Sequence, residues 1–308
     1  MSSQSVAGNG TATPETTRKR RDAPRETSAG PRSWFARIVV AILCVLWIVP
    51  VIGLFLTSFR PLDDANNSGW WTLFWTPSAW EGMNFDNYTT AIDDASLGTA
   101  LINSLAITLP ATFIPILIAA FAAYAFTFME FPGRDFLFLA VVSLLVVPNY
   151  IAFVPILRIY GEAEMGGTFP AVWLAHIGFG MSLAIYILRN YMATLPRSVI
   201  ESAKIDGASH FQTFFRLVLP MSVPALAAFA IFQFLWVWND LLVALIFVGP
   251  GDNAPITVAL RNNLMGQAGS GQHLITAGGF LSMALPIAVF LVMQRFFVRG
   301  MTAGAVKG

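Results

Sequence analysis

The residues with the most chemistry at close spacing lie between positions 196 and 220. Ser198 and Glu201 are three residues apart, and so are Ser209 and Gln212. A hydroxyl residue followed after three positions by Glu or Gln forms a capping box, in which both side chains bond to free N–H groups at the start of a helix. The two pairs therefore predict two short helices in this segment.

A glycine separates the two capping boxes, and no catalytic residues accompany it. Gly207 predicts a helix end, because glycine readily takes the positive φ of such ends. A phosphate-binding loop needs Gly-Lys followed by Ser or Thr, and the chain has neither sequence, so it does not hydrolyse ATP by that route. His176, His210 and His273 are not spaced as metal ligands, and Cys44 is the only cysteine. On these residues alone, Glu201 is a capping residue and Gly207 a helix stop.

The elements that position this segment are expected to cross a membrane. The chain is 56% hydrophobic and 11% charged, with a mean hydropathy of +0.65, whereas soluble domains carry about 25% charged residues. About 20 apolar residues span a bilayer as a helix. The segments that qualify are residues 36–59, 100–128, 136–157, 170–189, 221–248 and 276–297. We therefore predict an all-α membrane protein with six transmembrane helices and a cytoplasmic helical loop at 195–220.

Prolines and polar tails complete this organisation. Most of the apolar segments contain proline, and we expect neighbouring helices to satisfy the carbonyls that it leaves free. Residues 1–33 are polar and predict a disordered cytoplasmic tail. Residues 34–299 are expected to form the six-helix transmembrane domain and residues 300–308 a short cytoplasmic tail. The first apolar segment lacks a small-residue cleavage pattern, so we expect it to be retained.

Positive charge sets the expected orientation. With the N-terminus inside, all but three of the 18 Lys and Arg residues fall on the cytoplasmic side; the exceptions are Arg60, Arg158 and Arg261. This bias predicts that both termini are cytoplasmic. The outer segment 60–98 is acidic and contains a tryptophan cluster, Trp70, Trp71, Trp75 and Trp80. Indoles there favour the membrane interface, and a docking surface for an external partner is the alternative.

The 195–220 loop resembles the EAA loop of ABC importer permeases. The matching residues are Glu201, Ser202, Ala203, Asp206, Gly207, Leu217, Leu219 and Pro220. Ser202 replaces the usual first alanine, and the Asp before the glycine is similar to the carbohydrate-uptake branch. Residues 166–174, 236–240 and 297–308 also resemble sugar permeases of the maltose type. The resemblance covers residues 34–308.

The resemblance implies a membrane-spanning permease subunit, not an enzyme, in a bacterial plasma membrane. It implies import of a sugar or oligosaccharide, with a polyol or glycerol phosphate as alternatives. A separate ATPase dimer would bind ATP and Mg, and this chain would bind no cofactor or metal. A second homologous permease subunit and an extracellular or periplasmic solute-binding protein are the other implied partners. The lipid bilayer surrounds the chain, and nothing indicates nucleic-acid binding.

The same resemblance implies how the loop couples to the ATPase. The first loop helix would lie in a cleft on one ATPase subunit. The residues expected to take part are Val199, Ile200 and Ala203 for apolar contact, Glu201, Lys204 and Asp206 for a polar rim, and Ser202, Gly207, Leu219 and Pro220 in the same pattern. Closure of the ATPases would then push on this helix and turn spans five and four. Residues 300–308 fit an extended segment at the ATPase or a frayed end.

One charge lies within the fifth apolar segment. Asp240 follows Asn239 and Trp238, and an ionisable residue inside a membrane span is a functional hypothesis by default. With Trp236, these residues form a candidate substrate pathway, although packing or gating is an equal alternative for Asp240. A secondary transporter would instead predict inverted repeats and paired intramembrane charges, and a membrane enzyme would need clustered catalytic side chains. The sequence has neither feature.

Overall fold

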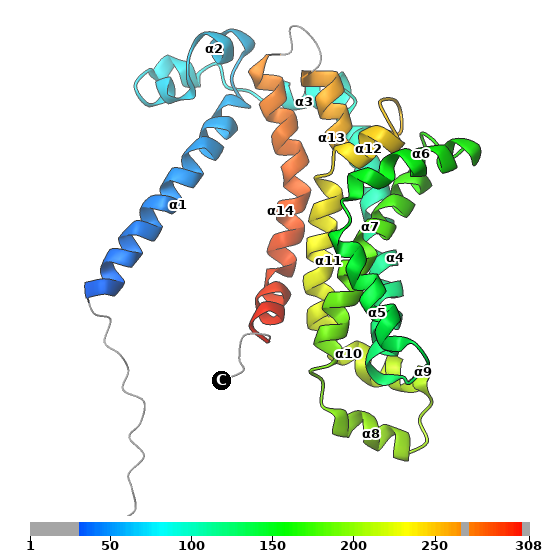
Figure 1. Cartoon of the computed structure of the whole chain (residues 1–308). Helices are drawn as coiled ribbons and strands as arrows, with labels where there is room; N and C mark the ends of the chain where they lie inside the picture. The colour runs from blue at the N-terminus through cyan, green and yellow to red at the C-terminus, as the bar shows by residue number, and fades with distance from the viewer. Residues whose placement is uncertain (1–30, 266–270, 304–308) are drawn as a thin grey trace, which may run out of the picture. The chain divides into compact units, whose positions relative to one another are not determined.

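A computed structural model describes residues 31–265 and 271–303, and the regular elements in these ranges are helices (Figure 1). The chain divides into two units, residues 1–50 and 51–308, which are described separately. Helix α1, Pro31–Thr57, passes through the boundary at Pro50. Residues 1–30 of the expected N-terminal tail and residues 304–308 lie outside the described residues. Residues 300–303 continue α14 as helix, where an extended segment was one expectation.

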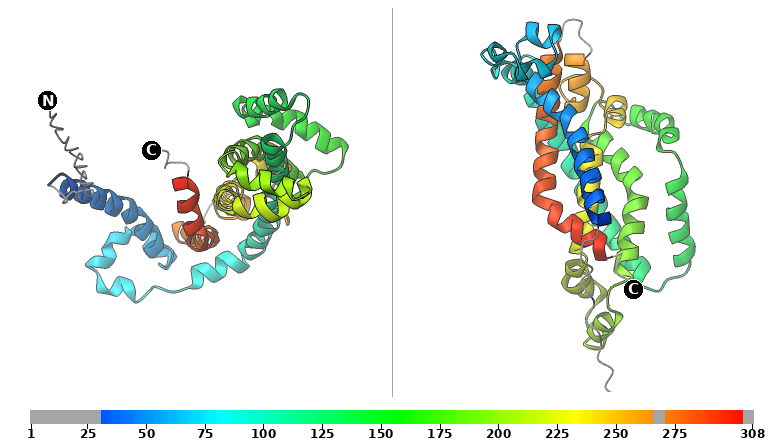
Figure 2. Two further views of the ribbon diagram at one scale, coloured as in Figure 1. Left: turned by 90° about the horizontal axis from the view of Figure 1, so that it is seen from below. Right: turned by 90° about the vertical axis from the view of Figure 1, so that its left-hand side faces the viewer.

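The second unit is built on four helices that pack side by side. These are α4 (Leu97–Phe128), α7 (Phe169–Met192), α11 (Val223–Trp238) and α14 (Gln272–Ala303). α4 packs against α7 and α11, and α11 also packs against α14 (Figures 1 and 2). Ala119, Ala120, Ala123 and Ala184 are fully buried in this bundle. Such small residues allow membrane helices to approach closely.

The predicted spans are only partly single helices. α1, α4, α7 and α14 are each long and apolar enough to cross a membrane, and two bent helix pairs raise the number to six if each pair is one span. The first pair bends by 94° between residues 134–146 and 149–162, and the second by 70° between residues 210–221 and 223–238. The first bend therefore interrupts the expected span 136–157. The second lies at residue 222, where the expected span 221–248 begins. That span is interrupted further along, between Trp238, where α11 ends, and Leu242, where the next helix begins.

The first interruption follows from a proline. Helix α5, Arg134–Ser143, continues as a 3₁₀ turn through Val146, and a second 3₁₀ turn leads into α6, Phe153–Glu162. Proline disfavours helical geometry in the residue before it, and Val147, which precedes Pro148, is extended with φ −75° and ψ 121°. The chain therefore turns at this point instead of continuing straight.

Short helices gather at the two ends of the second unit (Figure 1). One end holds α2 (Leu62–Asn67), the 3₁₀ helices Trp70–Phe74 and Pro77–Trp80, α3 (Asp86–Asp93), α12 (Leu242–Phe247), α13 (Ile256–Ala259) and the π-helix Leu260–Met265. The opposite end holds α8 (Arg197–Ile205), α9 (His210–Thr213), the π-helix Phe214–Val218 and α10 (Leu219–Met221).

Arg60 is the most deeply buried charge at the first of these ends. Its side chain is 1% exposed, and its guanidinium donates to the carbonyls of Asp64 and Ser68, each at 2.8 Å. The last carbonyls of a helix have no partner within the helix. Arg60 therefore caps the C-terminal end of α2, which explains why a basic residue is found at this end.

Three prolines inside α4 and α14 leave carbonyls without their usual N–H donor, and in each case a side chain from another helix supplies one. The donor nitrogen lies within 3.2 Å of the carbonyl oxygen each time. The bonds are Trp173 Nε1 to Ala106 O for Pro110, Gln233 Nε2 to Ala111 O for Pro115, and Trp238 Nε1 to Ser282 O for Pro286. The expectation that neighbouring helices satisfy these carbonyls is confirmed at these three prolines.

Candidate functional sites

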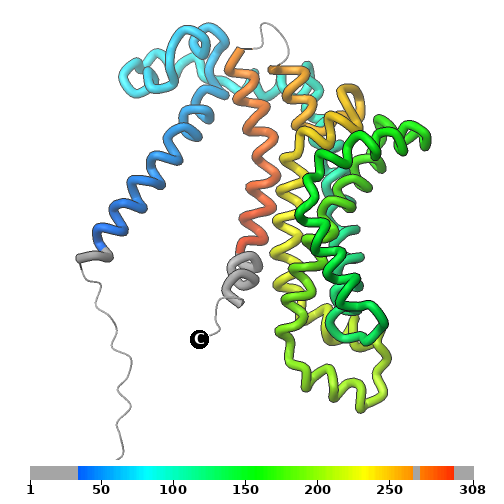
Figure 3. The backbone as a smooth tube through the Cα atoms, in the orientation of Figure 1, coloured from blue at the N-terminus to red at the C-terminus, as the bar shows by residue number. Residues whose placement is uncertain are grey.

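The segment 196–221 leaves the bundle as α8, reverses at a glycine and returns through α9 to α11 (Figure 3). Only one of its two predicted capping boxes forms. α8 begins at Arg197 after Pro196, with no side-chain cap. Ser198 is therefore already inside the first helical turn, where its hydroxyl is past the capping position. The predicted box of Ser198 and Glu201 is wrong by this shift in register.

The second capping box and the glycine stop are confirmed. Ser209 Oγ accepts the N–H of Gln212 at 3.3 Å, and Gln212 Oε1 accepts the N–H of Ser209 at 2.9 Å. Gly207 has φ +79°. The N–H of Ala208 donates to the carbonyl of Ala203 at 2.9 Å, which is the long bond of a Schellman helix end. Backbone chemistry thus fixes where α8 ends and α9 begins.

The exposed surface of α8 differs from the predicted one. Val199, Glu201, Ser202, Lys204, Ile205 and Asp206 are exposed; we call these six residues the α8 face. Ile200 is 3% exposed and packs in the same apolar cluster as Phe214 and Val218. The expected contact of Ile200 with an ATPase is therefore corrected, because this side chain anchors α8 to its own chain.

Ile205 is the apolar residue of α8 that sequence reasoning missed. It is 85% exposed, although an isoleucine usually gains from burial. It lies six residues after Val199 and two residues before the stop glycine, Gly207. Ala203 and Leu219 are half-buried, and Pro220 is exposed at the start of the return to α11. The α8 face thus combines two exposed aliphatic side chains with charges of both signs.

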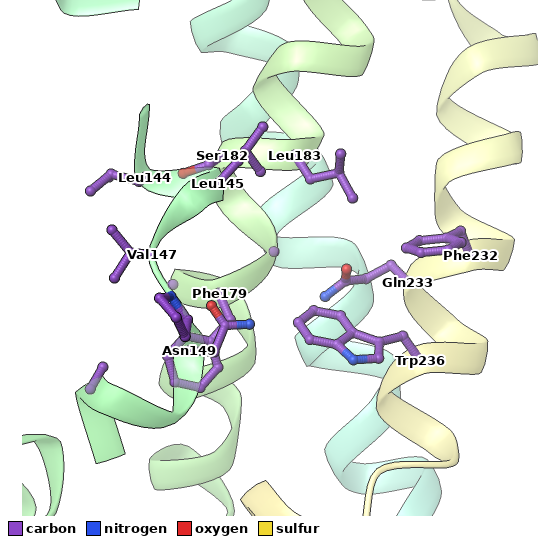
Figure 4. Close-up of a pocket in the computed structure, with 14 residues that line it drawn as sticks. Leu144, Leu145, Val147, Asn149, Phe179, Ser182, Leu183, Phe232, Gln233 and Trp236 are labelled. Atoms are coloured by element: carbon purple, nitrogen blue, oxygen red, sulfur yellow. The ribbon is translucent and has the colours of Figure 1, made fainter. Parts of the chain in front are cut away.

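A pocket of about 370 Å³ lies between the α5–α6 bend, α7 and α11. Gln233 and Trp236 extend into it from α11, toward Asn149 and Phe179 on the opposite wall (Figure 4). The full lining is Leu144, Leu145, Val147, Pro148, Asn149, Ala152, Gly178, Phe179, Gly180, Ser182, Leu183, Phe232, Gln233 and Trp236. The pocket therefore offers aromatic faces and a few uncharged polar groups.

Gln233 is the polar residue of this pocket that the sequence did not single out. It is 1% exposed, and its Oε1 is buried without a hydrogen-bond partner in the described residues. A Cβ at Gly180 would lie 2.9 Å from its carboxamide atoms. The glycine of α7 thus makes room for the Gln233 side chain. The sequence signal that could have identified it is a single glutamine within the apolar run of the fifth segment.

Of the four predicted pathway residues, only Trp236 lines the pocket. Trp238 is buried against Phe234 with ring centroids 5.7 Å apart, and its indole donates to the carbonyl of Ser282 on α14. Asn239 is exposed and donates to the carbonyl of Leu235 in its own helix. The structure therefore does not bring these residues together with Trp236.

Asp240 joins elements at the break between α11 and α12. Its carboxylate accepts the N–H of Ala244 at 3.1 Å, and its carbonyl accepts the hydroxyl of Thr257 at 2.7 Å. The carboxylate also lies 3.8 Å from Nε2 of the buried His176, whose ring meets Trp236 edge-to-face. The alternatives for this residue were a packing or gating role and sugar contact, and these contacts favour the first.

Comparison with known proteins identifies relatives over most of the chain. The family model described as "Binding-protein-dependent transport system inner membrane component" matches residues 27–303. The osmoprotective compounds uptake permease protein GgtD of Synechocystis is 50% identical over 88% of this chain and 91% of its own length. The alpha-glucoside transport system permease protein AglG of Rhizobium meliloti is 47% identical over 82% of this chain and 68% of its own length.

Solved structures agree in fold. A bacterial ABC transporter involved in the import of the acidic polysaccharide alginate matches with a TM-score of 0.72, covering 88% of this chain and 98% of that chain at 17% identity. The alginate ABC transporter in complex with an alginate pentasaccharide-bound periplasmic protein matches with a TM-score of 0.60 at 15% identity. At this identity the likeness concerns the fold alone.

Proposed function

The chain belongs to the family of binding-protein-dependent transport system inner membrane components, and from this premise we propose that it imports a neutral carbohydrate. It is a multi-pass membrane permease subunit of an ABC importer, not an enzyme. The observation that carries the solute class is the similarity, over 82% and 88% of this chain, to permeases named for alpha-glucosides and for osmoprotective compounds. A neutral glycoside is a solute class that fits both names.

The pocket beside Trp236 supports a neutral solute. Sugar rings present apolar C–H faces that suit aromatic side chains, and hydroxyls that suit amide groups. Trp236 and Phe179 supply the aromatic side chains, and Asn149 and Gln233 supply the amide groups. Neither Lys nor Arg is among the residues that line this pocket in the described part of the chain. A glycerol phosphate, which needs a cation or several N–H donors, is a poorer match.

The proposed partners follow from the two ends of the second unit. The α8 face, with Val199 and Ile205 exposed among charges, suits a cleft on an ATPase that binds ATP and Mg. A second, homologous permease subunit would complete the pathway, and an external solute-binding protein would deliver the solute at the opposite end. Both termini and the α8 face would be cytoplasmic, since the basic residues gather on that side.

Uptake by cells that lack the gene tests the proposed solute class. Initial uptake rates of radiolabelled α-linked disaccharides, a β-linked disaccharide, glycerol phosphate and an amino acid are compared with and without a plasmid copy. We expect loss and recovery of uptake for at least one neutral glycoside. Loss confined to glycerol phosphate or to the amino acid would exclude the neutral-carbohydrate proposal while leaving the family assignment intact.

A further inference from the structure

The helices that follow Gly207 are attached to α4, a helix far away in the sequence. The hydroxyl oxygen of Tyr124 in α4 lies 3.0 Å from Nδ1 of His210, the first residue of α9. The capping box of Ser209 and Gln212 fixes this helix start, so the position of His210 is set by the backbone. The polar contact therefore joins two ordered elements that are 86 residues apart.

Aromatic packing continues the same attachment one turn further along. Phe214 is 2% exposed and stacks on Phe121 with ring centroids 4.6 Å apart and 27° between the planes. It also meets Tyr124 edge-to-face at 5.3 Å. Residues three or four apart lie on the same face of a helix. His210 and Phe214 on one side, and Phe121 and Tyr124 on the other, thus form one contact strip.

The chain changes helical geometry at the end of this strip, where Phe214 begins a π-helix. Residues 214–218 form a π-helix, and the axis then bends by 70° into α11. π-helical turns are rare and often mark functional positions. The segment that contains α8 is therefore connected to two elements: to α11 through the bend, and to α4 through the strip.

We propose that Tyr124 is a positioning residue that transmits the movement of the 196–221 segment to α4. The inference rests on the proposed coupling of the α8 face to an ATPase. It adds the second span to the expectation that the loop turns spans five and four, because the side-chain contacts attach the loop to α4. The contact between Tyr124 and His210 fixes how α9 is aligned along α4, and the packed aromatic rings keep the two segments together.

The test follows the outer end of α4 in the complete importer complex. Cys44 is replaced by alanine and Thr99→Cys is introduced near the start of α4. A membrane-impermeant maleimide then labels it with and without ATP. We expect ATP to change the labelling rate, and Tyr124→Phe to reduce this change by about 2- to 10-fold, the range for loss of one net hydrogen bond. ATP hydrolysis is recorded in the same samples.

Matched variants separate positioning from general damage. His210→Leu is expected to match Tyr124→Phe, and the double variant to be no worse than either. His210→Asn retains a polar group near Nδ1 and is expected to restore the ATP response. Tyr88→Phe loses a similar hydroxyl contact, to Ser58 Oγ at 2.7 Å, at the other end of the unit, and is expected to respond like the parent protein.

Several results would overturn the inference. These are a full ATP response in Tyr124→Phe, a parent complex in which ATP leaves the labelling of Thr99→Cys unchanged, and a loss of response in Tyr88→Phe equal to that in Tyr124→Phe. The readout needs ATP but no solute. A wrong solute class would therefore appear in the uptake panel and leave this measurement unaffected.

Discussion

Trp173, Gln233 and Trp238 each bond to a carbonyl that a proline has left free. An unpaired carbonyl in the bilayer core costs several kcal/mol, with no water to replace the missing donor. Each donor therefore fixes which helix packs beside the proline and at what height. The prolines themselves were visible in the sequence. Their partners were not, because the bonds join residues 67, 122 and 44 positions apart.

A double-variant cycle at Trp238 and Pro286 tests this relation. Trp238→Phe keeps an aromatic ring beside Phe234 but removes the N–H that meets Ser282 O, so we expect the free energy of unfolding to fall by about 1 kcal/mol. In a Pro286→Ala background the backbone regains an N–H at position 286. The same tryptophan replacement should then cost clearly less. Unfolding by SDS titration in mixed micelles measures both differences.

Equal losses in the two backgrounds would contradict the relation. The tryptophan would then contribute through its size alone, and the match between its N–H and the carbonyl freed by proline would carry no energy.

At the scale of elements, the starts and ends of helices were predictable where a residue type strongly favours one local geometry. Gly207 and the pair Ser209–Gln212 behave as their residue types indicate. The Ser198–Glu201 pair has the same spacing, but α8 starts two residues too early for Ser198 to cap it. A prediction from the Ser–Glu spacing alone ignores Pro196, whose fixed φ also suits a helix start. Competition between two start signals explains the error.

The interrupted spans show a second limit at this scale. Hydropathy measures whether a segment suits lipid, and it does not register a change of direction within that segment. The turn at Pro148 was open to local reasoning. The end of α11 at Trp238 was not, because Asp240 bonds there to Ala244 and Thr257 in elements that come later in the chain. Tertiary contacts decided this boundary.

Gly207→Ala tests whether the stop between α8 and α9 matters for coupling. A Cβ at Gly207 meets no atom within 4 Å, but φ +79° costs a non-glycine residue about 1–2 kcal/mol. We expect ATP-driven uptake per permease molecule to fall several-fold, because the Schellman geometry that ends α8 at Gly207 would be lost. Gly133→Ala is the matched control, with φ +78° and no atom within 4 Å in the loop before α5.

Uptake by Gly133→Ala is expected to stay close to that of the parent chain, since its loop is outside the α8 face. Similar losses in both variants, at equal amounts in the membrane, would show that backbone strain in any loop has this effect. The special importance of Gly207 would then be excluded.

At the scale of the whole chain, charge and hydropathy already indicated a membrane protein and separated its two ends. The second unit has the helices of the 196–221 segment at one end and the acidic 60–98 segment at the other. Charge indicates which end is cytoplasmic, because Lys and Arg are retained inside. The pocket beside Trp236 could not be predicted in this way. It arises where the α5–α6 bend opens space between α7 and α11.

This orientation has a direct consequence for chemical labelling. In a Cys44→Ala background, Ser202→Cys lies on the α8 face and Asn253→Cys lies at the opposite end; both positions are exposed. Intact cells should label only Asn253→Cys with a membrane-impermeant maleimide, and inside-out vesicles only Ser202→Cys. The reverse pattern would mean that the basic residues face outward. The α8 face would then be out of reach of any cytoplasmic ATPase, and this result would exclude the proposed coupling together with the predicted orientation.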